Sequence, residues 1–267
     1  MKHCLLLLSL LFLFSFFISC EKLEEPSKEG LALHLSFDGD LNDYSINYNN
    51  GISLSTVNFV KGRWGQAIDF NGSTDYLQLS KNIISENGLS FSFWVKMREP
   101  VVTENNGSII CKYNMSARRR SFMIYSFGSF ETRNDKRLSA AFYKYDYTSS
   151  VHDHAKSFMT PEELAAFPDP TLWTIVNPKR IKTDTWTHCV INVTPAEIQT
   201  WINGELCVKK SREYDSYFDS PDEPIYIGNN LAIGEGDNNH FNGTLDELRI
   251  YSRELSKKEI IILYKNK

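Results

Sequence analysis

Alternation of apolar and polar residues is the feature that most limits how this chain can fold. In the clearest case, at 89–97, every second residue is apolar: Leu89, Phe91, Phe93, Val95 and Met97. A period of two places such side chains on one face of a β-strand. Similar short segments recur from residue 31 to residue 251, separated by turn signals such as Asn71-Gly72 and Asn203-Gly204. The pattern predicts an all-β fold, a two-sheet antiparallel sandwich.

One helix is expected, close to the end of the chain. Ser256 can cap its first turn, and Glu259 stands three residues later, which is the spacing of a capping box. Ile260, Leu263 and Tyr264 follow at helical spacing, so one side of the helix is apolar. We expect this short C-terminal helix to pack against the sandwich.

The N-terminal residues have the pattern of a secretion signal. The segment from Cys4 to Ile18 is apolar apart from two serines, which is short for a membrane span and typical of the apolar core of a signal peptide. It ends in Phe17-Ile18-Ser19-Cys20, which resembles a bacterial lipobox. The resemblance implies a signal peptide at 1–19 and a lipid on Cys20. An ordinary secretory signal cut near Ser19 is the alternative.

The residues after Cys20 are charged and poor in apolar side chains, so a flexible tether is predicted at 20–30. Their acidic character is similar to the surface-export signals of Bacteroidetes lipoproteins. The resemblance implies an outer membrane lipoprotein, held to the membrane through Cys20 and displayed at the cell surface.

The net charge argues against a nucleic-acid partner, and the spacing of the cysteines argues against a disulfide. The net charge of −4 argues against a nucleic-acid partner, because such partners need a basic surface. Beyond Cys20, the cysteines are Cys111, Cys189 and Cys207, an odd number that leaves at least one thiol unpaired. A strand expected at 198–202 would separate Cys189 from Cys207 by roughly 9–10 Å, beyond the ~7 Å limit between the Cα atoms of a disulfide. No bridge between them is expected.

A long insertion is predicted at about 148–184, and insertions of this length in compact β domains are often functional. It contains four prolines, and Thr160-Pro161 has the pattern of a helix start. His152-Asp153-His154 places two imidazoles on one face if the backbone is extended. With no third ligand nearby, a solvated loop is the favoured interpretation over a metal or acid–base site.

Four motifs in order resemble laminin-G-like jelly rolls of the concanavalin A-like lectin/glucanase superfamily. They are Leu33-His34-Leu35-Ser36-Phe37-Asp38-Gly39, Gly65-Gln66-Ala67-Ile68-Asp69-Phe70-Asn71-Gly72, the segment from Trp186-Thr187-His188 to Asn203-Gly204-Glu205, and Tyr251-Ser252-Arg253-Glu254-Leu255-Ser256. The resemblance covers the domain at 31–267 and implies a jelly-roll sandwich. It also implies glycan or protein ligands, often beside a structural calcium, and a structural role for His188. It does not imply catalysis.

Calcium is the metal that the sequence favours. The loop after the first strand, 38–43, is rich in carboxylate and amide oxygens, which Ca²⁺ prefers. In related jelly rolls this loop and the Asp of the last strand share a calcium, and the matching positions here are Asp38, Asp43 and Asp246. The alternative is that these side chains cap their own turns.

No catalytic residues are assigned. The E-x-D-x-x-E strand of related β-glucanases is missing, since Asp246-Glu247 has no third partner at that spacing. Glu247-Leu248-Arg249 bears only a weak resemblance to the catalytic residues of alginate-lyase relatives. A hydrolase or lyase of this fold, with its catalytic groups at 148–184, remains an alternative.

Aromatic residues favour a binding function. Tyr143, Tyr145 and Tyr147 alternate on one strand, and Trp173 lies in the insertion that follows. Sugar rings stack on aromatic faces, while phenol groups add hydrogen bonds. The hypothesis is a non-catalytic, surface-tethered lipoprotein that binds a glycan or polysaccharide. A protein-binding adhesion module is a further alternative.

Overall fold

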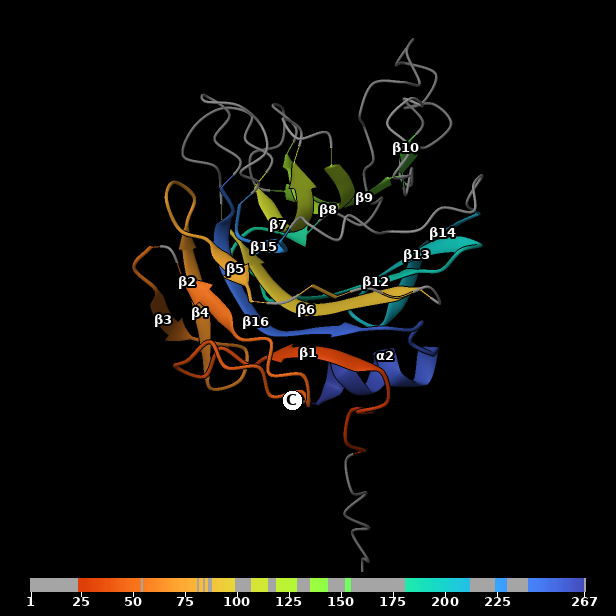
Figure 1. Ribbon diagram of the computed structural model, residues 1–267, viewed down its shortest axis with the longest axis horizontal. Coiled ribbons are helices and arrows are strands. Elements are labelled where there is room, and N and C mark those ends of the chain that lie inside the picture. The colour runs from red at the N-terminus through yellow and green to blue at the C-terminus, as the bar shows by residue number, and fades with distance from the viewer. Residues whose placement is uncertain are drawn as a thin grey trace, which may run out of the picture.

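The computed structural model shows two stacked antiparallel β-sheets (Figure 1). It describes residues 24–53, 55–80, 82–83, 85, 88–98, 107–114, 119–128, 135–143, 152–154, 181–211, 224–229 and 240–266. The sandwich confirms the predicted all-β jelly roll with a short C-terminal helix.

The first sheet, sheet A, carries eight strands within the described residues. They are β1 (Leu31–Leu35), β3 (Asn58–Lys61), β4 (Gln66–Asn71), β6 (Leu89–Met97), β12 (Thr187–Val193), β13 (Glu197–Ile202), β14 (Glu205–Ser211) and β16 (Asn242–Tyr251). Their order is β14-β13-β12-β6-β16-β4-β3, with β1 also paired to β16. The first and last strands of the chain are therefore neighbours.

The second sheet, sheet B, also has eight strands in the described part. They are β2 (Gly51–Ser53), β5 (Leu77–Leu79), β7 (Ser108–Asn114), β8 (Arg119–Gly128), β9 (Asp135–Tyr143), β10 (His152–His154), β11 (Ile181–Lys182) and β15 (Tyr226–Ile227). Their order is β10-β9-β8-β7-β15-β5-β2, with β11 paired to β9. β10 and β11 belong to the predicted insertion, and residues 155–180 lie outside the described residues.

The core lies between the two sheets. All five alternating apolar side chains of β6 are at most 1% exposed, which confirms the strand predicted at 89–97. Across the sandwich, the ring of Phe91 lies 4.9 Å from that of Phe122 on β8, centroid to centroid. Removing a buried ring of this kind costs about 3–5 kcal/mol of stability.

The helix α2 (Lys257–Lys265) begins as predicted. Ser256 accepts a hydrogen bond from the backbone of Glu259, and the Glu259 side chain bonds back to the backbone of Ser256. The apolar side of α2 packs on the outer face of sheet A, in a cluster that includes Val190, Trp201 and Leu263. Within the described residues, no helix has the length and hydrophobicity needed to cross a bilayer.

Both predicted turns form, but one connects two strands of sheet A and the other connects sheet A to sheet B. Asn203 and Gly204 have φ angles of 53° and 78°, as a type I′ hairpin turn requires. β13 therefore separates Cys189 from Cys207, and both residues are thiols, as expected. The turn at 71–75 instead takes the chain from sheet A to sheet B. Asn71 Oδ1 accepts hydrogen bonds from the backbone N–H groups of Ser73 and Thr74, which holds this crossing in place.

Candidate functional site

The predicted tyrosine strand lies at one side of sheet B. β9 ends at Tyr143, whose backbone pairs with His152 of β10, while Phe142 lies in the core. Residues 152–154 form the strand β10, so the favoured interpretation of this segment as a loop is wrong. Tyr145, Tyr147 and Trp173 lie outside the described residues, so their part in a site stays a prediction.

The strand order brings further aromatic residues to the same sheet. Tyr226 of β15 lies between Ile225 and Ile227, which are both core residues, so its ring is on the outer face, away from sheet A. It pairs with Gln78 of β5 on one side and Cys111 of β7 on the other. β15 and β9 are three strand spacings apart, roughly 14 Å across the sheet. That distance can accommodate several sugar rings.

Three rings gather on this face, and we call them the tyrosine–histidine cluster: Tyr76, Tyr226 and His240. The Tyr76 and Tyr226 centroids are 6.3 Å apart in an edge-to-face arrangement, and the Tyr76 and His240 centroids are 6.1 Å apart. All three side chains are partly exposed. Aromatic rings that remain partly open to solvent, with polar groups beside them, suit the apolar and polar faces of a sugar.

His240 is held in one orientation at the edge of the cluster. Its Nδ1 lies 3.4 Å from the carbonyl oxygen of Asp75, and its Nε2 lies 3.2 Å from Nδ2 of Asn229. A carbonyl only accepts, so Nδ1 carries the proton and Nε2 accepts from the amide. Burial lowers the pKa of His240. The ring is therefore neutral at pH 7 and acts as a hydrogen-bonding group, not as a charge.

The sequence predictions did not include the cluster. Ile225-Tyr226-Ile227 has the alternation of a strand with an outward tyrosine, and this signal could have identified Tyr226. Tyr76 and His240 could not be found in this way, because they meet Tyr226 only through the strand order β5-β15-β7.

Among the three predicted calcium ligands, Asp43 has its carboxylate fully engaged. Oδ1 accepts hydrogen bonds from the backbone N–H groups of His34 and Ser45, at 2.8 Å each. Oδ2 accepts hydrogen bonds from the Ser45 hydroxyl and from the backbone N–H of Asn49, at 2.7 Å each. Asp43 thus acts as a turn-capping residue, which was the alternative interpretation.

Asp246 and Asp38 support a different turn, at 62–65. Oδ2 of Asp246 accepts from the backbone N–H groups of Arg63 and Trp64, and Oδ1 of Asp38 accepts from that of Gln66. Burial, with smaller effects from neighbouring carboxylates, raises the pKa of Asp246 to about 7. Across the described residues, no group of three or more His, Cys, Asp or Glu is arranged to hold a metal ion. The calcium site stays a prediction, and within it the Asp43 carboxylate already accepts four hydrogen bonds.

A β-bulge in β16 explains why the adjacent acids Asp246 and Glu247 are both buried and have different partners. The register against β6 shifts between Asp246 and Arg249, and Glu247 adopts a φ of 52°. The Glu247 carboxylate contacts Nη2 of Arg249 at 2.6 Å and Nε2 of His34 at 2.9 Å. Asp246 and Glu247 are 0% and 1% exposed, so neither reaches a polysaccharide. These buried contacts of Glu247 are structural, and they give no support to the resemblance to alginate lyases.

A hollow of about 470 Å³ lies beside β1, on the other sheet. His34, Tyr44, Arg249 and Tyr251 contribute to its lining, together with residues 25–28. Burial lowers the pKa of His34, although its bond to Glu247 opposes the shift. The hollow offers polar and aromatic groups, and its His34 and Arg249 side chains already bond to the Glu247 carboxylate.

The fold and the aromatic outer face define a jelly-roll sandwich of the lectin type. A laminin G family model, described as the concanavalin A-like lectin/glucanases superfamily, matches residues 71–261. The chain belongs to this superfamily, as the four motifs indicated. No curated protein is matched by the sequence.

Solved structures share the fold at low sequence identity. Domain 4 of AbnA, an extracellular arabinanase from Geobacillus stearothermophilus, is similar over 90% of this chain and 100% of its own, with 21% identity and a TM-score of 0.62; it was solved with arabinotriose. The binding domain of Paraclostridial mosquitocidal protein 1 is similar over 89% of this chain, with 19% identity and a TM-score of 0.63. The binding domain of botulinum neurotoxin DC, solved with SialylT, has 13% identity and a TM-score of 0.60.

The two toxin domains are longer than the match, since this chain spans 52% of each. Another structure of the neurotoxin DC domain, at 14% identity and a TM-score of 0.61, contains rat synaptotagmin II. The fold is therefore found in proteins with carbohydrate ligands and in proteins with protein ligands.

Proposed function

We propose that this protein is a non-catalytic carbohydrate-binding lipoprotein that holds a glycan on the outer face of sheet B. The observation that carries the proposal is the tyrosine–histidine cluster. Tyr76, Tyr226 and His240 offer partly exposed ring faces, while Gln78, paired with Tyr226 across the strands, offers a side-chain amide beside them. A preformed arrangement of this kind binds with little loss of side-chain freedom.

The site extends across the sheet to the predicted tyrosines. Tyr143, at the end of β9, is in the same sheet, and Tyr145, Tyr147 and Trp173 follow it in the sequence. A polysaccharide lying across the strands contacts both groups. The arabinotriose bound by the Geobacillus domain, which is matched over its whole length, supports a saccharide ligand over a protein.

The lipobox-like segment supports the cellular part of the proposal. Cys20 carries a lipid, and the chain is displayed from the outer membrane at the cell surface. The test is membrane fractionation of cells that produce the full chain. Wild-type protein should sediment with membranes, and Cys20→Ser should accumulate as an uncleaved or soluble form. Equal membrane association of both proteins would contradict lipid anchoring.

Binding is tested by electrophoresis of residues 21–267 through gels that contain a panel of polysaccharides. The wild-type chain should be retarded by at least one polymer, and Tyr76→Ala with Tyr226→Ala should abolish the retardation. Tyr44→Ala is the matched control, because it removes an exposed tyrosine of the hollow beside β1, on sheet A. Tyr145→Ala with Trp173→Ala tests the predicted extension of the site.

Three results would redirect the proposal. Shortening of the polymer would indicate the enzyme alternative, with catalytic groups at 148–184. No retardation by any polymer would favour a protein ligand. Retardation that a chelator removes and Ca²⁺ restores, with a matching change in melting temperature, would support the predicted calcium; an unchanged result would argue against it.

A further inference from the structure

Exposed apolar side chains are concentrated in one short segment. In the described part of the chain, five large apolar side chains are exposed, and four of them lie between residues 44 and 52. Tyr44, Ile46 and Tyr48 are 55%, 87% and 74% exposed, and we call these three residues the ridge. Such a concentration of exposed apolar surface marks an interaction site.

The base of the ridge is fixed by polar residues that alternate with it. Asp43 bonds to Ser45 and to Asn49, as described above, and Asn47 Nδ2 donates to the carbonyl oxygens of Leu31 and Ala32 at 3.3 and 3.1 Å. Tyr48 has a φ of 51°, an unfavourable conformation for a bulky residue. The loop therefore presents the ridge in one conformation, and it does so at a cost in backbone strain.

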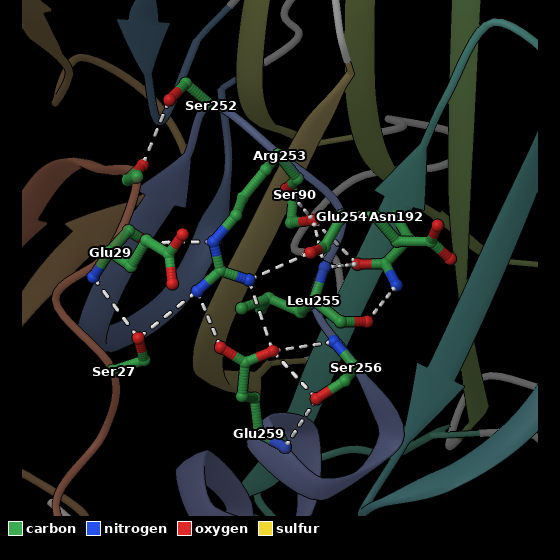
Figure 2. A network of polar contacts seen from close by, with 11 residues as sticks. Ser27, Glu29, Ser90, Asn192, Ser252, Arg253, Glu254, Leu255, Ser256 and Glu259 are labelled. Carbon is green, nitrogen blue, oxygen red and sulfur yellow. Dashed lines mark hydrogen bonds and ion pairs between the residues drawn. The ribbon is translucent and has the colours of Figure 1, made fainter.

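The ridge lies beside the segment through which the chain enters the domain. Residues 24–30, which the sequence assigns to a tether, lie against α2 and the residues before it (Figure 2). Arg253 donates to the carbonyl oxygen of Glu29 and to the hydroxyl of Ser27, and it also pairs with Glu259. Nearer the start, the Glu24 carbonyl accepts from Nδ2 of Asn266 at 2.6 Å.

One hollow connects this segment to the ridge. Lys28, Gly30, Leu31 and Ile46 all contribute to its lining. In Figure 1 the described chain begins on the side of sheet A that α2 covers, opposite sheet B. The ridge, the entry segment and α2 thus share one side of the molecule.

We propose that this side rests on a lipid bilayer and that the ridge enters the headgroup region. The inference rests on the proposed lipid on Cys20. Only four residue steps separate Cys20 from Glu24, so the chain between them spans at most roughly 14 Å. The anchor therefore keeps this side of the domain at the bilayer surface. Tyrosine prefers the membrane–water interface, and an exposed isoleucine gains by entering the apolar region.

The contact is apolar and not electrostatic. Residues 24–30 and 252–266 carry equal numbers of acidic and basic side chains, and the loop that bears the ridge adds Asp38, Asp40 and Asp43. An acidic lipid therefore brings no large gain, and the contact should persist in zwitterionic bilayers and at high salt.

The test places an environment-sensitive fluorophore on the ridge. Ile46→Cys is labelled in a Cys207→Ser chain, since Cys111 and Cys189 are buried. The chain, from residue 21, carries an N-terminal hexahistidine tag that nickel-chelating lipids hold on phosphatidylcholine vesicles. The probe emission should shift to the blue and be quenched by nitroxide-labelled lipids, both in low and in high salt. Ser73→Cys, in the exposed turn after β4, is the control and should show neither change.

A probe at 46 that keeps its aqueous emission on vesicle-bound protein would overturn the proposal. A shift that needs added polysaccharide would also overturn it, because the ridge would then be a glycan contact. Adding Tyr48→Ser should weaken the quenching if the ridge enters as a unit. The tag replaces the proposed lipid anchor, so the vesicle experiment does not depend on lipidation of Cys20. A failure of that lipidation would be detected by the cell fractionation described above.

Discussion

His188 shows how burial fixes the chemistry of a single residue. His188 is 1% exposed, its ring contacts those of Trp94 and Tyr264, and its Nε2 lies 3.0 Å from the Ser92 hydroxyl. Burial, helped by the charge of Arg249, lowers its pKa to about 3. These contacts give it the structural role that the family resemblance implied.

The lowered pKa predicts that His188 stays neutral across the physiological range. In the unfolded chain its pKa is the ordinary histidine value of 6.5. Its contribution to stability is therefore complete above that pH and is lost as the pH falls towards about 3. NMR of the imidazole protons should show no titration of His188 between about pH 8 and about pH 5. A midpoint near that of a free histidine would contradict the burial argument.

Asp43→Asn should destabilise the domain more than its small change in size suggests. The amide nitrogen cannot accept, so two of the four donors around Asp43 would lose their partner. The expected loss is about 2–4 kcal/mol, measured as the free energy of urea unfolding. Tyr44→Ala, at the next residue, should change it by less than about 0.5 kcal/mol. Similar values for both variants would show that Asp43 is not the capping residue.

At the level of elements, the start of α2 couples the helix to the entry segment. Glu259 closes the capping box and also pairs with Arg253, which in turn bonds to Glu29 (Figure 2). The hydrogen bond from Arg253, with those from Ser256, lowers the pKa of Glu259 to about 2. A carboxylate with a depressed pKa stabilises the fold above its unfolded pKa, and that contribution is lost as the pH falls through its folded pKa.

Glu259→Gln should therefore remove an acid-sensitive part of the stability. Wild-type protein should lose stability between about pH 4.5 and about pH 2, and the variant should be less stable at pH 7 by about 1 kcal/mol, since the pair is partly exposed. Thermal unfolding across this pH range measures both. Lys258→Gln, at the adjacent exposed position, is the control. Parallel pH curves for Glu259→Gln and wild type would contradict the role of this carboxylate.

Elements with local signals were predictable from the sequence. The capping box of α2, the Asn203-Gly204 turn and the alternation at 89–97 all appear where expected, because each depends on residues close in the chain. The β16 bulge at Glu247 was not predictable. It depends on how β16 aligns with β6, about 150 residues away in the chain, and no local pattern records that register.

For the whole molecule, the jelly roll was predictable and the site was only partly so. Four motifs in order were enough for the fold. The tyrosine–histidine cluster required knowledge of which distant strands are neighbours, since residues near 76 and 226 meet only through sheet B. The ridge could not be predicted without knowing which side chains are exposed. The alternation at 43–49 is consistent with that exposure but does not establish it.

The proposed anchor and the proposed ligand site lie on opposite faces, which predicts that both can be engaged at once. α2 covers the outer face of sheet A, whereas the cluster lies on the outer face of sheet B. Protein held on vesicles by its N-terminus should therefore bind the same polysaccharide as the free chain, with an affinity within about threefold. Vesicle co-sedimentation of labelled polymer measures this. A loss of tenfold or more on vesicles would place the ligand on the membrane side.

The pairing of β1 with β16 has a consequence for how the chain acquires its structure. Leu33 aligns with Ile250, so sheet A cannot be completed until nearly the whole sequence is present. Contacts between such distant residues form slowly, because a long loop must close first. On the proposed route of export through a narrow channel, N-terminus first, the chain would therefore stay unfolded during transport and complete its sandwich only after β16 emerges.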